Sequence, residues 1–169
     1  MQSESSKVPV VLIAGFSQPA RHRLIRQALM DAPPVATPQL AWLDHQDTPQ
    51  ELATPAPNQS FVACVCCSGS LVFSTNLTRL LRQQRWDGLF LSLGASAEPA
   101  KMLELLKSVT WAPHLGSVRL FSIMDALSQK LLAQPEHPLH VVARQQRDLS
   151  DAVLAPGEPL PKDLWKTGL

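Results

Sequence analysis

The chain has 169 residues, a formal net charge of +1, 45% hydrophobic residues and 17% charged residues. This length indicates one domain. The apolar content is enough for a packed core and excludes wholesale disorder. The near-neutral charge argues against a nucleic-acid binder that works through bulk electrostatics.

The start of the sequence and the cysteines indicate a soluble protein of the cytoplasm. The first seven residues are polar, and the apolar run that follows them, 8–16, is about half a membrane span. All three cysteines lie within four positions, at Cys64, Cys66 and Cys67. Such a cluster cannot staple distant segments, which excludes a disulfide scaffold. We therefore expect no membrane partner and no nucleic-acid partner.

The hydrophobic pattern predicts strands that alternate with helices. In chain order we expect a buried strand over 8–14, a helix over 20–30, a short strand over 40–43, a strand over 61–67, a helix over 74–85 capped by Ser74, a strand over 89–93, a helix opened by Glu98 and Pro99, a strand over 118–124, helices over 126–133 and 139–148, and an edge strand over 152–155. This alternation predicts an α/β domain with a mostly parallel sheet, over 1–155. A proline-rich tail, 156–169, is expected to be a loose extension.

The turn after the first strand lies where a phosphate-binding loop would lie, between an apolar strand and a helix. A working loop reads G-x-x-x-x-G-K-[ST], and in the window 15–22 only the first glycine, Gly15, survives. Taken alone, this window is an ordinary strand-to-helix turn.

Five blocks of sequence together resemble the CobW-like P-loop GTPases. The most specific is Cys64-Val65-Cys66-Cys67, which matches the C-x-C-C motif of that family and follows a predicted strand. The other blocks lie in the family's order at 7–16, 86–99, 123–126 and 150–154. The resemblance implies a three-layer P-loop NTPase-like fold. On this comparison we expect no counterpart of the family's C-terminal domain.

The departures from the family lie in its nucleotide-binding residues. The family's loop ends Gly-Lys-Thr, where this chain has Ala20, Arg21 and His22. Gln18 replaces a glycine, Pro19 has no N–H to donate, and Ser92 stands where the family has a Glu. Losing two or three hydrogen bonds to a charged group, together with the hydroxyl ligand of magnesium that His22 replaces, should cost at least about 4 kcal/mol of phosphate binding. Such a loss turns a micromolar nucleotide affinity into roughly a millimolar one.

Residual anion binding through Gly15, Arg21 and His22 remains an alternative to a solvated basic helix face. Arg21 and its neighbours Arg23 and Arg26 could recover part of the lost phosphate binding through charge. A guanidinium fork is, however, no substitute for the compact lysine ammonium inside a closed loop. We expect neither GTP with magnesium nor significant GTPase activity.

The cysteines keep the chemistry of a metal site. Thiolates suit zinc and other soft transition metals, and a closed zinc site has four ligands. Three sulfurs converge only if the chain turns at Cys67, because adjacent side chains of a strand point to opposite faces. Asp44, His45 and His22 are candidates for the fourth ligand. The alternative is that the cysteines only pack in the core, as free cysteines often do.

The sequence thus favours a CobW-like pseudo-GTPase that is not an enzyme and holds zinc or another transition metal at Cys64, Cys66 and Cys67. It would serve metal homeostasis or regulate an intact relative, with a protein client or a second copy of the chain as partner. The alternatives are an interaction module without metal or nucleotide, and a weakly active GTP-binding protein. Trp42, Trp86 and Trp111 are expected to plug the rim of the core.

Overall fold

The computed structural model of the chain describes residues 7–31, 39–45, 59–62 and 70–165. Its elements run β1 (Val8–Ala14), α1 (Gln18–Met30), β2 (Leu40–His45), β3 (Gln59–Val62), α2 (Ser70–Gln83), β4 (Gly88–Ser92), α3 (Pro99–Leu106), β5 (Leu115–Ile123), α4 (Ala126–Leu132), α5 (His140–Asp148) and β6 (Ala152–Leu154). None of the helices in these ranges is long and apolar enough to cross a membrane.

The strands form one six-stranded sheet in the order β3-β2-β4-β1-β5-β6, and every neighbouring pair is parallel. β1 lies inside the sheet and all seven of its residues are buried, as its unbroken apolar sequence predicts. β6 is an edge strand, as expected. The predicted α/β fold with a mostly parallel sheet is therefore confirmed.

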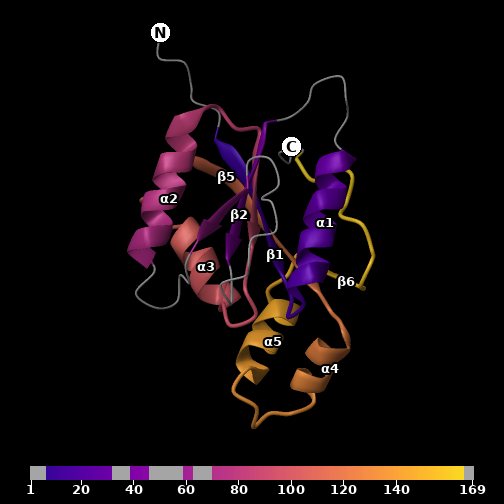
Figure 1. Ribbon diagram of the computed structural model, residues 1–169. Coiled ribbons are helices and arrows are strands. Elements are labelled where there is room, and N and C mark those ends of the chain that lie inside the picture. Colours follow the sequence, from indigo (N-terminus) through magenta and orange to yellow (C-terminus); the bar gives the residue numbers. More distant parts are fainter. Residues whose placement is uncertain (1–6, 32–38, 46–58, 63–69, 166–169) are drawn as a thin grey trace.

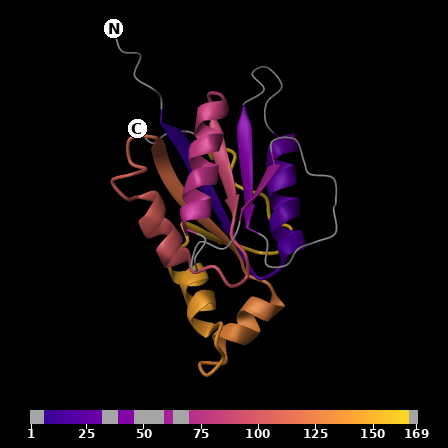
Figure 2. The same ribbon diagram turned by 60° about the vertical axis from the view of Figure 1, so that its left-hand side comes forward.

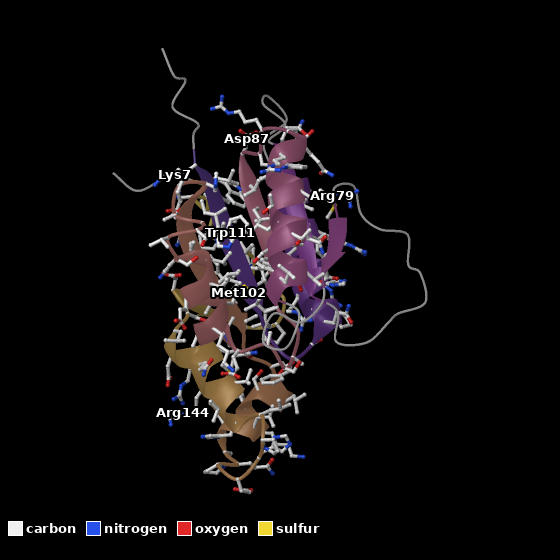
Figure 3. All side chains as sticks on the ribbon, turned by 90° about the vertical axis from the view of Figure 1, so that its left-hand side faces the viewer. Lys7, Arg79, Asp87, Met102, Trp111 and Arg144 are labelled. Carbon is white, nitrogen blue, oxygen red and sulfur yellow. The ribbon has the colours of Figure 1, made fainter. Side chains whose placement is uncertain are left out.

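Helices cover both faces of the sheet and make three layers (Figure 1). α2 and α3 lie on one face, and α1 lies on the other. The core on the α2 and α3 side includes Phe73, Met102 and Trp111, the last two of which are labelled in Figure 3. The core on the α1 side includes Ile25, Trp42 and Phe90. Trp42 is fully buried there, so the expectation that it plugs the rim is wrong.

The short helices α4 and α5 lie beyond the carboxyl ends of the strands (Figures 1 and 2). They pack on Phe16, which directly follows the turn after β1, through Leu131, Val142 and Ala143. Asp125 caps α4 by accepting a hydrogen bond from the amide of Ser128 at 2.8 Å. This pair of helices therefore supports the turn that the sequence compares with a phosphate loop.

Helix α2 begins one turn earlier than the sequence predicted. It starts at Ser70 and not after Ser74, so the assignment of Ser74 as the cap is wrong. The physical reason is Phe73, which is fully buried and extends the apolar stripe of Leu77 and Leu80 by a turn. The predicted strand over 61–67 is described only as far as Val62, where β3 ends.

The C-terminal segment packs on the sheet as far as Trp165. Leu164 is buried in the core on the α1 side. The ring of Trp165 meets that of Phe90 edge-on at 5.0 Å between centroids. It lies so close to Gly88 that a Cβ there would come within 2.4 Å of it. The division into a domain and a tail stays a prediction, but the described part of that tail is not the loose extension expected.

Candidate functional site

The turn after β1 is held in a conformation that favours glycine. Gly15 has φ +146°, and a Cβ at this position would lie 3.2 Å from both Cβ and O of Ile123 at the end of β5. Gly15 is the first glycine of the phosphate-loop motif, and this chain retains it. Its positive φ and the close approach of Ile123 explain why a glycine is needed here without any bound phosphate.

Helix α1 begins shortly after this turn, and backbone amides in its first turn donate hydrogen bonds to the capping residue. Ser17 is the N-cap, and its Oγ accepts a hydrogen bond of 3.3 Å from the amide of Ala20. The amide of Arg21 donates to the carbonyl of Ser17 at 3.1 Å. Pro19 between them has no N–H. At positions 19–21, therefore, no backbone donor points freely toward an anion.

The side chain of Arg21 turns inward. It is fully buried, Nε donates to Oγ of Ser92 at 3.1 Å, and Nη1 donates to the carbonyl oxygen of Gly15. A buried guanidinium is costly unless it is hydrogen-bonded, and here it is bonded to the same turn that it would have to leave open for a phosphate. Gly15 and Arg21 are thus brought together, but by binding each other.

His22 and Asp44, two of the proposed fourth ligands, are in direct contact. Nε2 of His22 lies 2.7 Å from Oδ2 of Asp44, whose side chain is fully buried, while the imidazole is 17% exposed. The edge of the His22 ring meets Trp42 with 5.0 Å between centroids. Since Asp44 is the last residue but one of β2 and His22 lies in the first turns of α1, this contact fixes the helix against the strand.

Sheet register explains why these polar groups gather at one place. Ser92 pairs with Ile13 of β1 on one side and with Asp44 of β2 on the other. Paired residues of parallel strands share a face, so Ser92 and Asp44 lie side by side beneath α1. The side chains of Arg21 and His22 on α1 contact Ser92 and Asp44, respectively. The result is a buried polar cluster at the carboxyl ends of the central strands.

The cysteine motif lies outside the described residues. β3 ends at Val62, which pairs with His45 of β2, and Cys64 follows two positions later in the sequence. Within the described ranges, no group of three or more His, Cys, Asp or Glu side chains could hold a metal ion. Cys64, Cys66 and Cys67 as ligands therefore remain a prediction.

Sequence reasoning missed two relationships in this cluster. Ser92 was interpreted only as a lost carboxylate, whereas it accepts a hydrogen bond from Arg21. Asp44 and His22 were considered separately, and nothing in their spacing of 22 positions signals that they touch. Strand order was the missing information, because β2 lies beside β4.

Comparisons with known proteins give one informative match. No family model matches the sequence, and no curated protein matches it. The fold resembles the crystal structure of the Zn(II)-bound YjiA GTPase from E. coli, with a TM-score of 0.58 and 14% sequence identity. The match covers 89% of this chain and 49% of that one, so the chain spans about half the length of this neighbour. The likeness shows that the chain has a P-loop GTPase type of fold.

Proposed function

We propose that this chain is a CobW-like pseudo-GTPase that binds a transition metal, most simply zinc, through Cys64, Cys66 and Cys67. It serves metal homeostasis or regulates an intact relative, through a protein client or a second copy of the chain. The fold neighbour is a GTPase described as Zn(II)-bound. The fold alone does not carry these properties over, so the proposal rests on the polar cluster beneath α1.

The contacts of Arg21 are the observation that carries the loss of nucleotide binding. A phosphate loop needs free backbone amides and a helix N-terminus aimed at the anion. Here the amides of Ala20 and Arg21 donate within the first turn of α1, and the guanidinium of Arg21 bonds Gly15 and Ser92. A nucleotide would have to break these buried bonds before it gained any of its own.

The position of Asp44 supports the metal site. Its carboxylate is fully buried at the end of β2, beside the end of β3 that leads into the cysteine motif. Buried carboxylates in proteins are paired or coordinate a metal ion, and Asp44 contacts His22 at 2.7 Å. Cysteine thiolates with a carboxylate or imidazole form a donor set that suits zinc. Cys64, Cys66 and Cys67 would hold the metal, and Asp44 and His22 are the described candidates for completing its shell.

When bound, zinc in a closed site of this kind would stabilise the fold and hold its ligands together. The chain's own residues would provide and orient those ligands. Asp44 fixes His22 through the 2.7 Å contact, and the cysteines give up their protons to bind. A reducing cytoplasm would keep those thiols available.

Two measurements on the whole chain test this function. Protein purified without a chelator is analysed for zinc, alongside a Cys64→Ser/Cys66→Ser variant, and GTP is titrated in the presence of magnesium. We expect zinc in the wild type, loss of zinc in the variant and no micromolar GTP affinity. A metal-free wild type would favour the interaction module, and micromolar GTP binding or magnesium-dependent turnover would favour the weakly active GTPase.

A further inference from the structure

One side of α1 carries four hydrogen-bond donors that open onto a surface pocket. The pocket has a volume of about 780 Å³ and is lined by Gln18, Pro19, His22, Arg23, Arg26, Gln27, Met30 and Asp31. We call Gln18, His22, Arg23 and Arg26 the donor face. Gln18, His22 and Arg26 follow one another at intervals of four residues, and Arg23 and Arg26 are three apart. These spacings bring side chains onto the same side of a helix.

Among the described residues, three of the four side chains of this face, those of Gln18, Arg23 and Arg26, have donors without a recorded acceptor. Nε2 of Gln18 is buried and has no hydrogen-bond partner. Both Arg23 and Arg26 are exposed, and in the part of the chain that the structure describes neither is seen in an ion pair. Of the described residues that line the pocket, one carries a carboxylate, Asp31, which follows the last turn of α1. A buried amide donor beside two uncompensated cations indicates a ligand that is anionic and rich in acceptors.

His22 has a defined orientation on the donor face. Its Nε2 is buried against Asp44, which anchors the ring from inside. No described residue forms a hydrogen bond with its Nδ1, and the ring lines the pocket. A carboxylate that holds one ring nitrogen sets the orientation of the other, which is how proteins position an imidazole toward a ligand. Unlike the two arginines, His22 is therefore positioned before any ligand arrives.

We propose that the donor face binds a phosphate group, either inorganic phosphate or the phosphate of a small monoester. Arginine forks match phosphate oxygens in geometry and charge. The side-chain amide of Gln18 adds a donor, and Nδ1 of His22 adds another when the ring carries both protons. The site shares Gln18 and His22 with the window of the lost phosphate loop but differs from that loop in its cations, because Arg21 is buried while Arg23 and Arg26 are exposed. It shares His22 with the candidates for the fourth metal ligand, but it includes none of the cysteines proposed to hold the metal.

The test is a titration of the full chain with inorganic phosphate, and separately with phenyl phosphate, at constant ionic strength against chloride. Amide chemical shifts report where each anion binds. We expect saturable binding with shifts along α1, and Arg23→Gln/Arg26→Gln should weaken it at least about tenfold. Tighter binding of phenyl phosphate would identify a monoester as the ligand, and tighter binding of the free ion would identify phosphate itself.

The matched control is Arg79→Gln/Arg82→Gln on α2. These two arginines have the same spacing of three and line a pocket on the other face of the sheet, where Arg79 is labelled in Figure 3. The control should change the affinity less than about twofold, because salt screens the attraction between the anion and charges that lie far from it. Gln18→Ala should weaken binding at least about threefold, since it removes the buried donor. An absence of saturable binding, or equal losses from the two arginine pairs, would overturn the proposal.

Discussion

Nε of Arg21 donates a 3.1 Å hydrogen bond to Oγ of Ser92, and both side chains are fully buried. The two residues lie 71 positions apart and join α1 to the end of β4. In the family that this sequence resembles, the corresponding positions carry a lysine and a glutamate. Here they bond each other, and in our proposal these contacts take the place of contacts to the phosphates of a nucleotide.

The first prediction concerns Ser92. Ser92→Ala leaves the buried guanidinium of Arg21 without one of its acceptors and should lower the free energy of unfolding by about 1.5–3 kcal/mol. The matched control is Ser122→Ala in β5, another fully buried serine, which accepts a hydrogen bond from Ser150. That neutral bond should be worth only about 0.5–1.5 kcal/mol. Urea unfolding measures both, and equal losses would count against the special role of the Arg21 contact.

The second prediction concerns the lost loop. A variant with Gln18→Gly, Pro19→Ala, Ala20→Gly, Arg21→Lys and His22→Thr restores the glycines, lysine and hydroxyl of a phosphate loop and removes the bond to Ser92. Its affinity for GTP with magnesium should rise at least about tenfold, because several donors to charged oxygens return. Arg21→Lys alone should bring no such gain, since the internally capped first turn remains. Calorimetric titration distinguishes the two, and an unchanged affinity in the full variant would contradict this explanation.

The third prediction concerns Asp44. Asp44→Asn keeps the size of the side chain but removes its charge and weakens the hold on His22. If the carboxylate belongs to the metal site or orients its ligands, zinc affinity should fall about 10–100-fold. Asp31→Asn is the control, because Asp31 is exposed at the far end of α1. Competition with a chromophoric chelator gives both affinities, and an unchanged value for Asp44→Asn would remove this residue from the proposed site.

The fourth prediction concerns the C-terminal segment. Leu164 is 5% exposed and packs in the core on the α1 side, so Leu164→Ala should lower the free energy of unfolding by about 2–5 kcal/mol. Val109→Ala is the control at a side chain that is 91% exposed, and it should change stability by less than about 0.5 kcal/mol. A loss of similar size in both variants would mean that the segment does not stabilise the fold.

The sequence predicted the fold well because each element has a local signal. The buried run of β1, the proline that opens α3 and the apolar spacing of α1 all identify their elements without tertiary information. The misjudged start of α2 had a visible cause, since Phe73 continues the helical stripe. Trp42 could not be placed, because its burial depends on β2 lying next to β4, and strand order is not a local property.

The site was harder to predict for the same reason. Gly15, Arg21 and His22 could be found by comparing one short window with a motif. The partners of Arg21 and His22 are Ser92 and Asp44, which reach them only through the register of three strands. A motif comparison shows which residues have been lost, but it does not show what the replacements bind. The sequence shows only that the lysine is replaced, and the structure shows that the arginine in its place bonds Gly15 and Ser92.

The central claim is that the chain keeps a metal site but not a nucleotide site. The most direct test measures zinc affinity of the full wild-type chain by chelator competition, with and without millimolar GTP and magnesium. We predict saturable binding of about one zinc per chain, as for a closed thiolate site, with the same affinity in both conditions. An absence of saturable zinc binding, or a zinc affinity that changes when GTP is added, would contradict the claim.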